Sequence, residues 1–213
     1  MYKLRLRFVK DGTAKYISHL DLMQVFRRAF LRIGLELAYS SGFHPHMQMN
    51  ILLPLSTGFS SECELLDLEL AGDTLPDALI ERLNGALPEG VRITGIVDSR
   101  RKTGEIASVR YRVAVEGEIE LSEVEALFRQ ETILLNKRTK RGESEVDIKP
   151  LIHRLQITPT DGGVMLDACL AAGQDNLNPE YLIRAIELYL GAEDLYTSFH
   201  RVEILDAQGL AFA

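Results

Sequence analysis

The sequence predicts an α+β protein made of two ferredoxin-like units of the βαββαβ type, each with a mainly antiparallel sheet. Helical and strand periodicities follow the order β-α-β-β-α-β in the first half, with one added strand, and the same order recurs in the second half. A polar, charged segment separates the halves. We therefore expect one unit over residues 1–98, a linker over 99–105 and a second unit over 106–213. One continuous sheet shared by both halves is the main alternative.

The first half begins with a strand, because apolar and basic residues alternate over residues 3–8. Ser18 then stands where a helix N-cap is expected, with the acidic Asp21 three residues later, which is close to a capping box. An apolar stripe continues along this helix until Gly34 ends it. The other elements predicted for this half are strands over residues 35–39, 48–53, 65–70 and 91–97 and a helix over residues 75–87.

The second half repeats the pattern with a hairpin at its centre. The sequence Thr160-Asp161-Gly162-Gly163 separates two alternating strands and is typical of a tight turn. Asn178 and Pro179 precede another apolar stripe and predict the start of a helix there. The elements predicted for this half are strands over residues 109–115, 151–158, 164–171 and 199–205 and helices over residues 121–130 and from 179 onward.

Composition limits the location and the partners. No apolar run approaches the ~20 residues of a membrane span, and residues 1–12 lack the apolar core of a secretion signal. We therefore expect a cytoplasmic protein with no membrane contact. Cys63 and Cys169 are far apart in sequence, so each is expected to be a small buried residue on a strand and not part of a disulfide. A net charge of −7 makes the chain a poor general polyanion binder, and no DNA binding is expected.

The unusual chemistry is concentrated in residues 16–54, which hold three of the five histidines: His19, His44 and His46. We expect the Ser-His-x-Asp start of the helix to face the Gly-Phe-His-Pro-His loop. His19 and His46 are the candidate general acid/base groups, because imidazole titrates near neutrality. The candidate binding residues around them are Ser18, Asp21, Arg27, Arg28, Tyr39, Ser40, Gly42, Phe43, His44 and Pro45.

Alternatives remain open for each group. His19 falls on the apolar stripe, so it is either a core histidine or a group lining a cleft. His44 and His46 flank Pro45 and could converge with His19 on zinc or iron, or could be surface histidines of a rigid loop. The arginines form either a solvated helix face or a phosphate-contacting ridge, which the strand residues Lys3, Arg5 and Arg7 would extend.

The sequence contains no Walker A motif, no GxGxxG after a strand, and no HExxH or GxSxG. The chain also lacks CxxxCxxC, so it cannot itself ligate an iron–sulfur cluster of the radical SAM type. These absences favour a non-catalytic role over an enzymatic one. No cofactor and no metal ion is predicted for the chain.

Several runs of sequence together resemble a bacterial family of unknown function, the radical SAM-linked family. The runs are FVKDG at 8–12, KYISHLDLM at 15–23, RRA at 27–29, LAYSSGFHPH at 37–46, LPLSTG at 53–58 and ELLDLEL at 64–70. Members of that family are found fused to, or encoded beside, radical SAM proteins with a cobalamin-binding-type domain. Many relatives carry Asn at the position of His44, which places the shared surface on the other candidate residues and weakens a three-histidine metal site.

The resemblance implies an accessory or substrate-recognition protein that acts with a separate radical SAM protein. A candidate for their joint reaction is the modification or processing of RNA. A weaker resemblance to the paired ferredoxin-like RNA-processing endonucleases of CRISPR systems implies the first alternative. In that alternative the chain binds RNA or cleaves it without a metal, using His19 or His46. The second alternative is a metal enzyme ligated by His19, His44 and His46.

Overall fold

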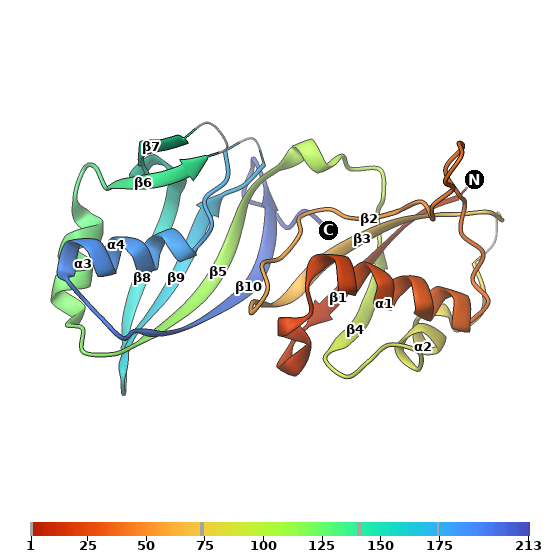
Figure 1. Cartoon of the computed structure of the whole chain (residues 1–213), viewed down its shortest axis with the longest axis horizontal. Coiled ribbons are helices and arrows are strands. Elements are labelled where there is room, and N and C mark those ends of the chain that lie inside the picture. Colours follow the sequence, from red (N-terminus) through yellow and green to blue (C-terminus); the bar gives the residue numbers. More distant parts are fainter. Residues whose placement is uncertain (1, 73–74, 140–141, 174) are drawn as a thin grey trace. The chain divides into compact units, whose positions relative to one another are not determined.

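The computed structural model describes residues 2–72, 75–139, 142–173 and 175–213 (Figure 1). It is a mixed α/β structure whose strands pair antiparallel. The chain divides into two compact units, unit 1 through Thr103 and unit 2 from Gly104 to Phe212. Within the described residues, no helix is both long and apolar enough to span a membrane.

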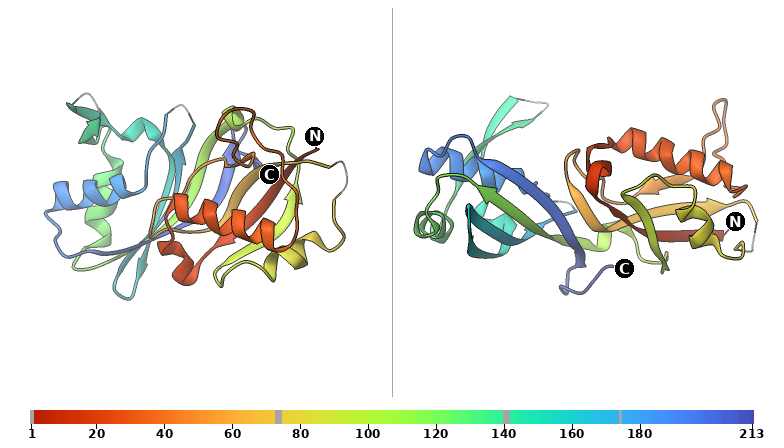
Figure 2. Two further views of the ribbon diagram at one scale, coloured as in Figure 1. Left: turned by 45° about the vertical axis from the view of Figure 1, so that its right-hand side comes forward. Right: turned by 90° about the horizontal axis from the view of Figure 1, so that it is seen from below.

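Unit 1 places two helices on one face of an antiparallel sheet, as Figures 1 and 2 show. Its strands lie in the order β4-β1-β3-β2. Its elements are β1 (Tyr2–Lys10), α1 (His19–Arg32), β2 (Met49–Ile51), β3 (Ser60–Leu70), α2 (Leu79–Asn84) and β4 (Val91–Val97), with a 3-10 turn at Gly12–Tyr16.

The core of unit 1 follows from the two periodicities that the sequence contains. Alternate residues of β1 and β3 and one stripe of α1 point to the same layer, where they are buried together with residues of α2 and β4. At its centre the Phe26 ring meets Phe8 edge-on, with 4.9 Å between the ring centroids, and stacks on Phe30 at 6.1 Å. The sheet face opposite α1 carries the alternate positions of the same strands, among them Lys3 and Arg5 of β1 and Asp67 and Glu69 of β3.

Unit 2 has the corresponding arrangement plus a small separate hairpin. Its main strands lie in the order β10-β5-β9-β8, and each neighbouring pair is antiparallel. Asn178 accepts the backbone N–H of Glu180 at 3.0 Å, which places its side chain at the predicted helix start. The elements are β5 (Ile106–Glu116), α3 (Leu121–Arg129), β6 (Leu134–Thr139), β7 (Gly142–Asp147), β8 (Ile152–Thr160), β9 (Gly163–Ala171), α4 (Glu180–Leu190) and β10 (Tyr196–Asp206), with a 3-10 turn at Lys149–Leu151.

Three elements differ from the prediction. The helix expected over 75–87 spans only Leu79–Asn84, because Ala78 adopts a left-handed conformation (φ 51°) that an α-helix cannot continue through. The strand expected over 35–39 is reduced to two isolated bridges, Leu37 with Leu70 and Tyr39 with Met47. The β6–β7 hairpin was not predicted, since its charged sequence lacks a clear alternation. Both cysteines lie on strands as expected, Cys63 buried and Cys169 half-buried, and neither takes part in a disulfide.

The segment after β4 is fastened to unit 1 by polar contacts. Arg5 donates from Nη1 to the carbonyl of Asp98 at 3.3 Å and from Nη2 to the carbonyl of Arg101 at 2.9 Å. Arg100 donates side-chain hydrogen bonds to the Asp98 carboxylate, which lowers the pKa of that carboxyl to about 2. A 3-10 turn at Thr103–Glu105 follows. The predicted linker is therefore held by specific contacts over its first residues.

Candidate functional site

The start of α1 has the predicted cap. Ser18 is extended (φ −66°, ψ 162°), and its Oγ accepts the backbone N–H of Asp21 at 3.2 Å. The Ser18 hydroxyl also lies 2.6 Å from Oδ2 of Asp21, to which it donates. This is half of a capping box, because Asp21 accepts the Ser18 hydroxyl and not the Ser18 backbone N–H. Both side chains are thus engaged with each other and with the helix terminus.

His19 lies at the edge of the apolar stripe of α1. The stripe proper is buried and consists of Leu22, Phe26, Ala29 and Phe30, whereas His19 is half-buried. Its Nδ1 is buried and has no hydrogen-bond partner within the described residues. A buried polar atom without a partner costs about 1–3 kcal/mol. His19 is therefore not a core histidine whose ring nitrogens are all hydrogen-bonded. Nor is its buried ring nitrogen paired with a charged side chain within the described residues.

The predicted Gly-Phe-His-Pro-His loop is the tip of a short hairpin, here called the Phe43 hairpin (residues 39–47). Ser40 and His46 close it. Ser40 N donates to the His46 carbonyl at 2.9 Å, His46 N donates to Ser40 Oγ at 3.1 Å, and Ser40 Oγ lies 2.7 Å from His46 Nδ1. Gly42 has φ +134°, a conformation that side chains disfavour. At the tip, the Phe43 side chain is fully exposed.

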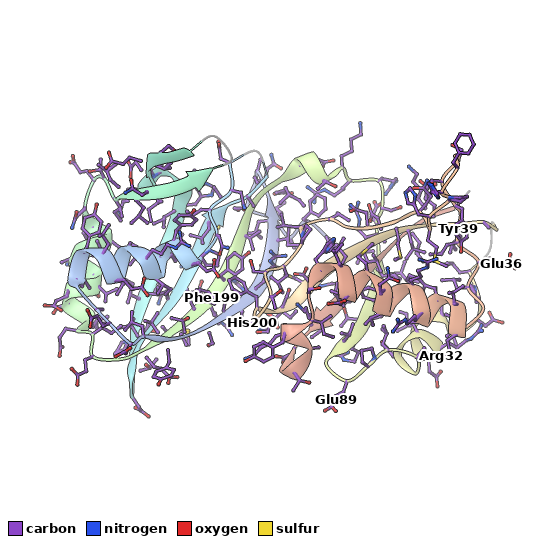
Figure 3. All side chains as sticks on the ribbon, in the orientation of Figure 1. Arg32, Glu36, Tyr39, Glu89, Phe199 and His200 are labelled. Carbon is purple, nitrogen blue, oxygen red and sulfur yellow. The ribbon has the colours of Figure 1, made fainter. Side chains whose placement is uncertain are left out.

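The base of the Phe43 hairpin is attached to the end of β3. Ala38 N donates to the carbonyl of Glu69 at 2.8 Å, and Glu69 N donates to the carbonyl of Gln48 at 3.0 Å. Figure 2 shows the hairpin projecting on the side of the sheet that α1 covers. Figure 3 shows Arg32, Glu36 and Tyr39 along the path from α1 to the hairpin. The hairpin is therefore a closed projection on an ordered base.

The two predicted halves of the site lie at opposite ends of unit 1. The helix start is beside the end of β1, where Lys10 Nζ donates to the carbonyl of Ile17 at 2.8 Å. The hairpin base is beside the other end, where Leu70 pairs with both Leu37 and Tyr2. Eight residue steps along β1 at about 3.3 Å each separate these ends by roughly 26 Å. The expectation that the helix start faces the loop is therefore wrong.

This separation also removes the geometric basis of a three-histidine centre. His44 and His46 share the hairpin, but His19 is at the far end of α1. Within the part of the chain that the structure describes, no group of three or more His, Cys, Asp or Glu side chains is placed to hold a metal ion.

The outer face of α1 carries exposed apolar and basic side chains. Leu20, Gln24, Arg27 and Leu31 follow helical spacing along one line and are exposed; we call these four the α1 stripe. Arg28 is exposed beside it. Within the described residues, neither Arg27 nor Arg28 makes a hydrogen bond or an ion pair. The two predicted arginines thus remain available to a partner.

Of the three basic residues expected to form a face on the first strand, Lys3 and Arg5 are neutralised by carboxylates, and Arg7 lies opposite Leu65. Arg5 is buried and donates to both carboxylate oxygens of Asp67, from Nε at 2.6 Å and from Nη2 at 2.9 Å. Lys3 forms a 3.4 Å ion pair with Glu69. The register sets both pairs, because Lys3 lies opposite Glu69 and Arg5 opposite Asp67. A phosphate-binding platform on this face is therefore not supported.

An apolar groove that was not predicted from the sequence lies at the base of the Phe43 hairpin. It has a volume of about 390 Å³ and lies where the end of α1 meets the following segment. Its lining residues are Leu31, Gly34, Leu35, Glu36, Leu37, Tyr39, Met47 and Ala71. In the sequence, only the alternating apolar residues at 35 and 37 could have indicated the groove. The same alternation is equally typical of a strand.

The fold and the candidate site together define a mixed α/β protein whose strands pair antiparallel and from which the Phe43 hairpin projects. A chain in the crystal structure of a Cbf5-Nop10-Gar1 complex has a similar fold, with a TM-score of 0.55 and 10% identity. The match covers 94% of this chain and 48% of that chain, so this chain spans about half the length of the matched one. An unknown protein from Galdieria sulphuraria matches with a TM-score of 0.26 and 14% identity, over 94% of this chain and 98% of that one.

No curated protein matches the sequence. The chain belongs to the bacterial family described as "Uncharacterized protein conserved in bacteria (DUF2344)", whose profile matches residues 3–179.

Proposed function

We propose that this chain is an accessory recognition protein that acts with a separate radical SAM protein and contacts it through the Phe43 hairpin and the α1 stripe. One observation carries the proposal: Phe43 is fully exposed at the tip of a hairpin that its own hydrogen bonds hold closed. An exposed aromatic ring makes no contribution to the core of its own unit. Buried in a partner, the same ring would be a strong anchor.

Pre-organisation supports this role. The Ser40–His46 contacts fix the hairpin before any partner arrives, so less conformational entropy is lost on binding. Leu20 and Leu31 extend the exposed apolar surface along α1, and Arg27 lies between them. Apolar anchors with arginine beside them are typical of protein interfaces. The identity of the partner rests on the resemblance to the radical SAM-linked family.

We also propose that both units are ferredoxin-like. Numbered within each unit and without the β6–β7 hairpin, the four main strands lie in the order 4-1-3-2. Each unit has one helix after its first strand and one before its last. These orders support two βαββαβ units, the second with an inserted hairpin.

Replacing Phe43 by alanine is expected to weaken binding of a radical SAM protein of the kind that the resemblance implies by about tenfold or more, because aromatic anchors dominate interface energies. The full chain and the cluster-loaded partner would be mixed anaerobically and titrated by calorimetry. Leu188→Ala is the matched control, since Leu188 is an exposed leucine on α4 of unit 2. Absence of binding by the unsubstituted chain would overturn the proposal, and equal loss with Leu188→Ala would move the interface away from the hairpin.

RNA binding is the second candidate function, favoured by the exposed Arg27 and Arg28 together with an exposed aromatic ring on which a base could stack. For single-stranded RNA the slope of log K against log salt is about 0.7 for each phosphate contact. If both arginines contact phosphates, changing both to alanine should reduce this slope by about 1.4. Fluorescence anisotropy at several salt concentrations measures it, with the exposed Arg92→Ala as control. A flat salt response would exclude this candidate.

A further inference from the structure

Unit 1 contains both a projecting apolar side chain and an apolar groove. The projecting side chain is Phe43 at the hairpin tip. The groove lies at the base of the same hairpin, between the end of α1 and Met47. Its volume of about 390 Å³ exceeds the cavity of about 150 Å³ that holds a benzene molecule in a protein interior. A phenyl ring therefore fits the groove in size and polarity.

A hairpin cannot insert its own tip into its own base, but a second copy can supply the tip. When two hairpins lie side by side and antiparallel about a two-fold axis, the tip of each meets the base of the other. That arrangement is isologous and closed: it makes the same contact twice and leaves no unused tip or groove.

The polar groups of the two regions are also complementary. Glu36 lines the groove and is exposed. His44 and His46 flank the tip on either side of Pro45 and are exposed as well. With the Phe43 ring of one copy in the groove of the other, the imidazole N–H groups beside it lie near a carboxylate that can accept their hydrogen bonds. The tip itself carries no acidic residue that would repel Glu36.

We propose that this chain forms a homodimer by reciprocal insertion of Phe43 into the groove that Leu31, Leu37, Tyr39 and Met47 line in the second copy. Two aromatic rings of about 150–250 Å² each bury less area than the roughly 1,200–2,000 Å² of a stable interface. The dimer is therefore weak and depends on concentration. The dimer covers the same Phe43 that we propose contacts the radical SAM protein. Dimer formation and partner binding therefore exclude each other, and the dimer consists of chains that have no radical SAM protein bound.

Sedimentation of the full chain alone, over a concentration series from micromolar to millimolar, tests the proposal. The unsubstituted chain is expected to show a reversible monomer–dimer equilibrium. Phe43→Ser should raise the dimer dissociation constant by about tenfold or more. Ala71→Trp, at an exposed position of the groove, should have the same effect by filling it. Both positions are exposed, so both variants are expected to keep the circular dichroism spectrum of the unsubstituted chain.

Mixing the two variants distinguishes reciprocal insertion from a general loss of association. In the mixed dimer, Phe43 of the Ala71→Trp copy meets the intact groove of the Phe43→Ser copy, so one of the two contacts is restored. Differently labelled variants should therefore associate with each other more tightly than either does with itself. A chain that is monomeric at millimolar concentration, or a dimer that Phe43→Ser leaves unchanged, would overturn the inference. The assay contains no radical SAM protein, so its outcome is independent of the proposed function.

Discussion

Phe26→Ala is expected to lower the free energy of unfolding by about 3–5 kcal/mol, the range for truncating a fully buried phenylalanine. Phe26 is completely buried, and its ring joins α1 to the sheet through Phe8 and extends along the helix to Phe30. The alanine variant leaves a cavity between two aromatic rings, which can close only in part because β1 is held by strands on both sides. Urea unfolding followed by circular dichroism measures the change.

Leu20→Ala is the matched control for this prediction. Leu20 is on the same helix but is 75% exposed, so its truncation should change the stability by less than about 0.5 kcal/mol. Equal losses for the two variants would show that α1 is not held on the sheet by the Phe26 contacts. Because α1 carries the stripe and leads into the Phe43 hairpin, the Phe26 variant should also weaken any binding through that surface.

Asp67→Ala should destabilise the chain by about 2–3 kcal/mol, because it leaves the buried Arg5 guanidinium without its carboxylate. Asp67 takes two hydrogen bonds from Arg5, whose side chain is only 2% exposed. The carbonyl groups of Asp98 and Arg101 remain as acceptors, which limits the loss. We expect the segment after β4 to loosen as well, and limited proteolysis near Arg100 and Arg101 would detect this.

Glu69→Ala provides the comparison on the same strand and the same sheet face. Its partner Lys3 is 71% exposed and the ion pair is 3.4 Å long, so the loss should be below about 1 kcal/mol. Chemical denaturation of both variants gives the difference directly. If Glu69→Ala were as destabilising as Asp67→Ala, burial of Arg5 would not be the source of the effect.

Local sequence predicted the elements whose signals are themselves local. Ser18 and Asp21 identified the start of α1, because the cap is formed within three residues. Residues 91–97 alternate and form β4 over those same residues. Helix α2 was overestimated, since the hydrophobic pattern gave no sign that Ala78 adopts a left-handed conformation. The β6–β7 hairpin was missed because the pairing of its two strands, which selects it, cannot be read from a single segment.

The sequence named candidate site residues but could not give their geometry. The sequence singled out Arg27, Phe43 and His46, and all three are exposed. It could not show that α1 carries its first turn and the hairpin to opposite ends of β1, because that depends on where each end of the helix meets the sheet. It also could not show that Arg5 is buried by Asp67, which is 62 residues away.

Most of the main helices and strands, and the segment in which unusual side chains gather, could be predicted from local sequence, because capping and periodicity depend on neighbours within one turn or one strand. Which of those side chains meet depends on the tertiary structure. The register of β1 against β3 pairs Lys3 and Arg5 with carboxylates. The length of α1 separates His19 from His46. The hydrogen bonds between Ser40 and His46 close the hairpin and leave Phe43 exposed, with an apolar groove at the base of the hairpin. These outcomes depend on contacts between residues distant in sequence, whose energies no local pattern contains.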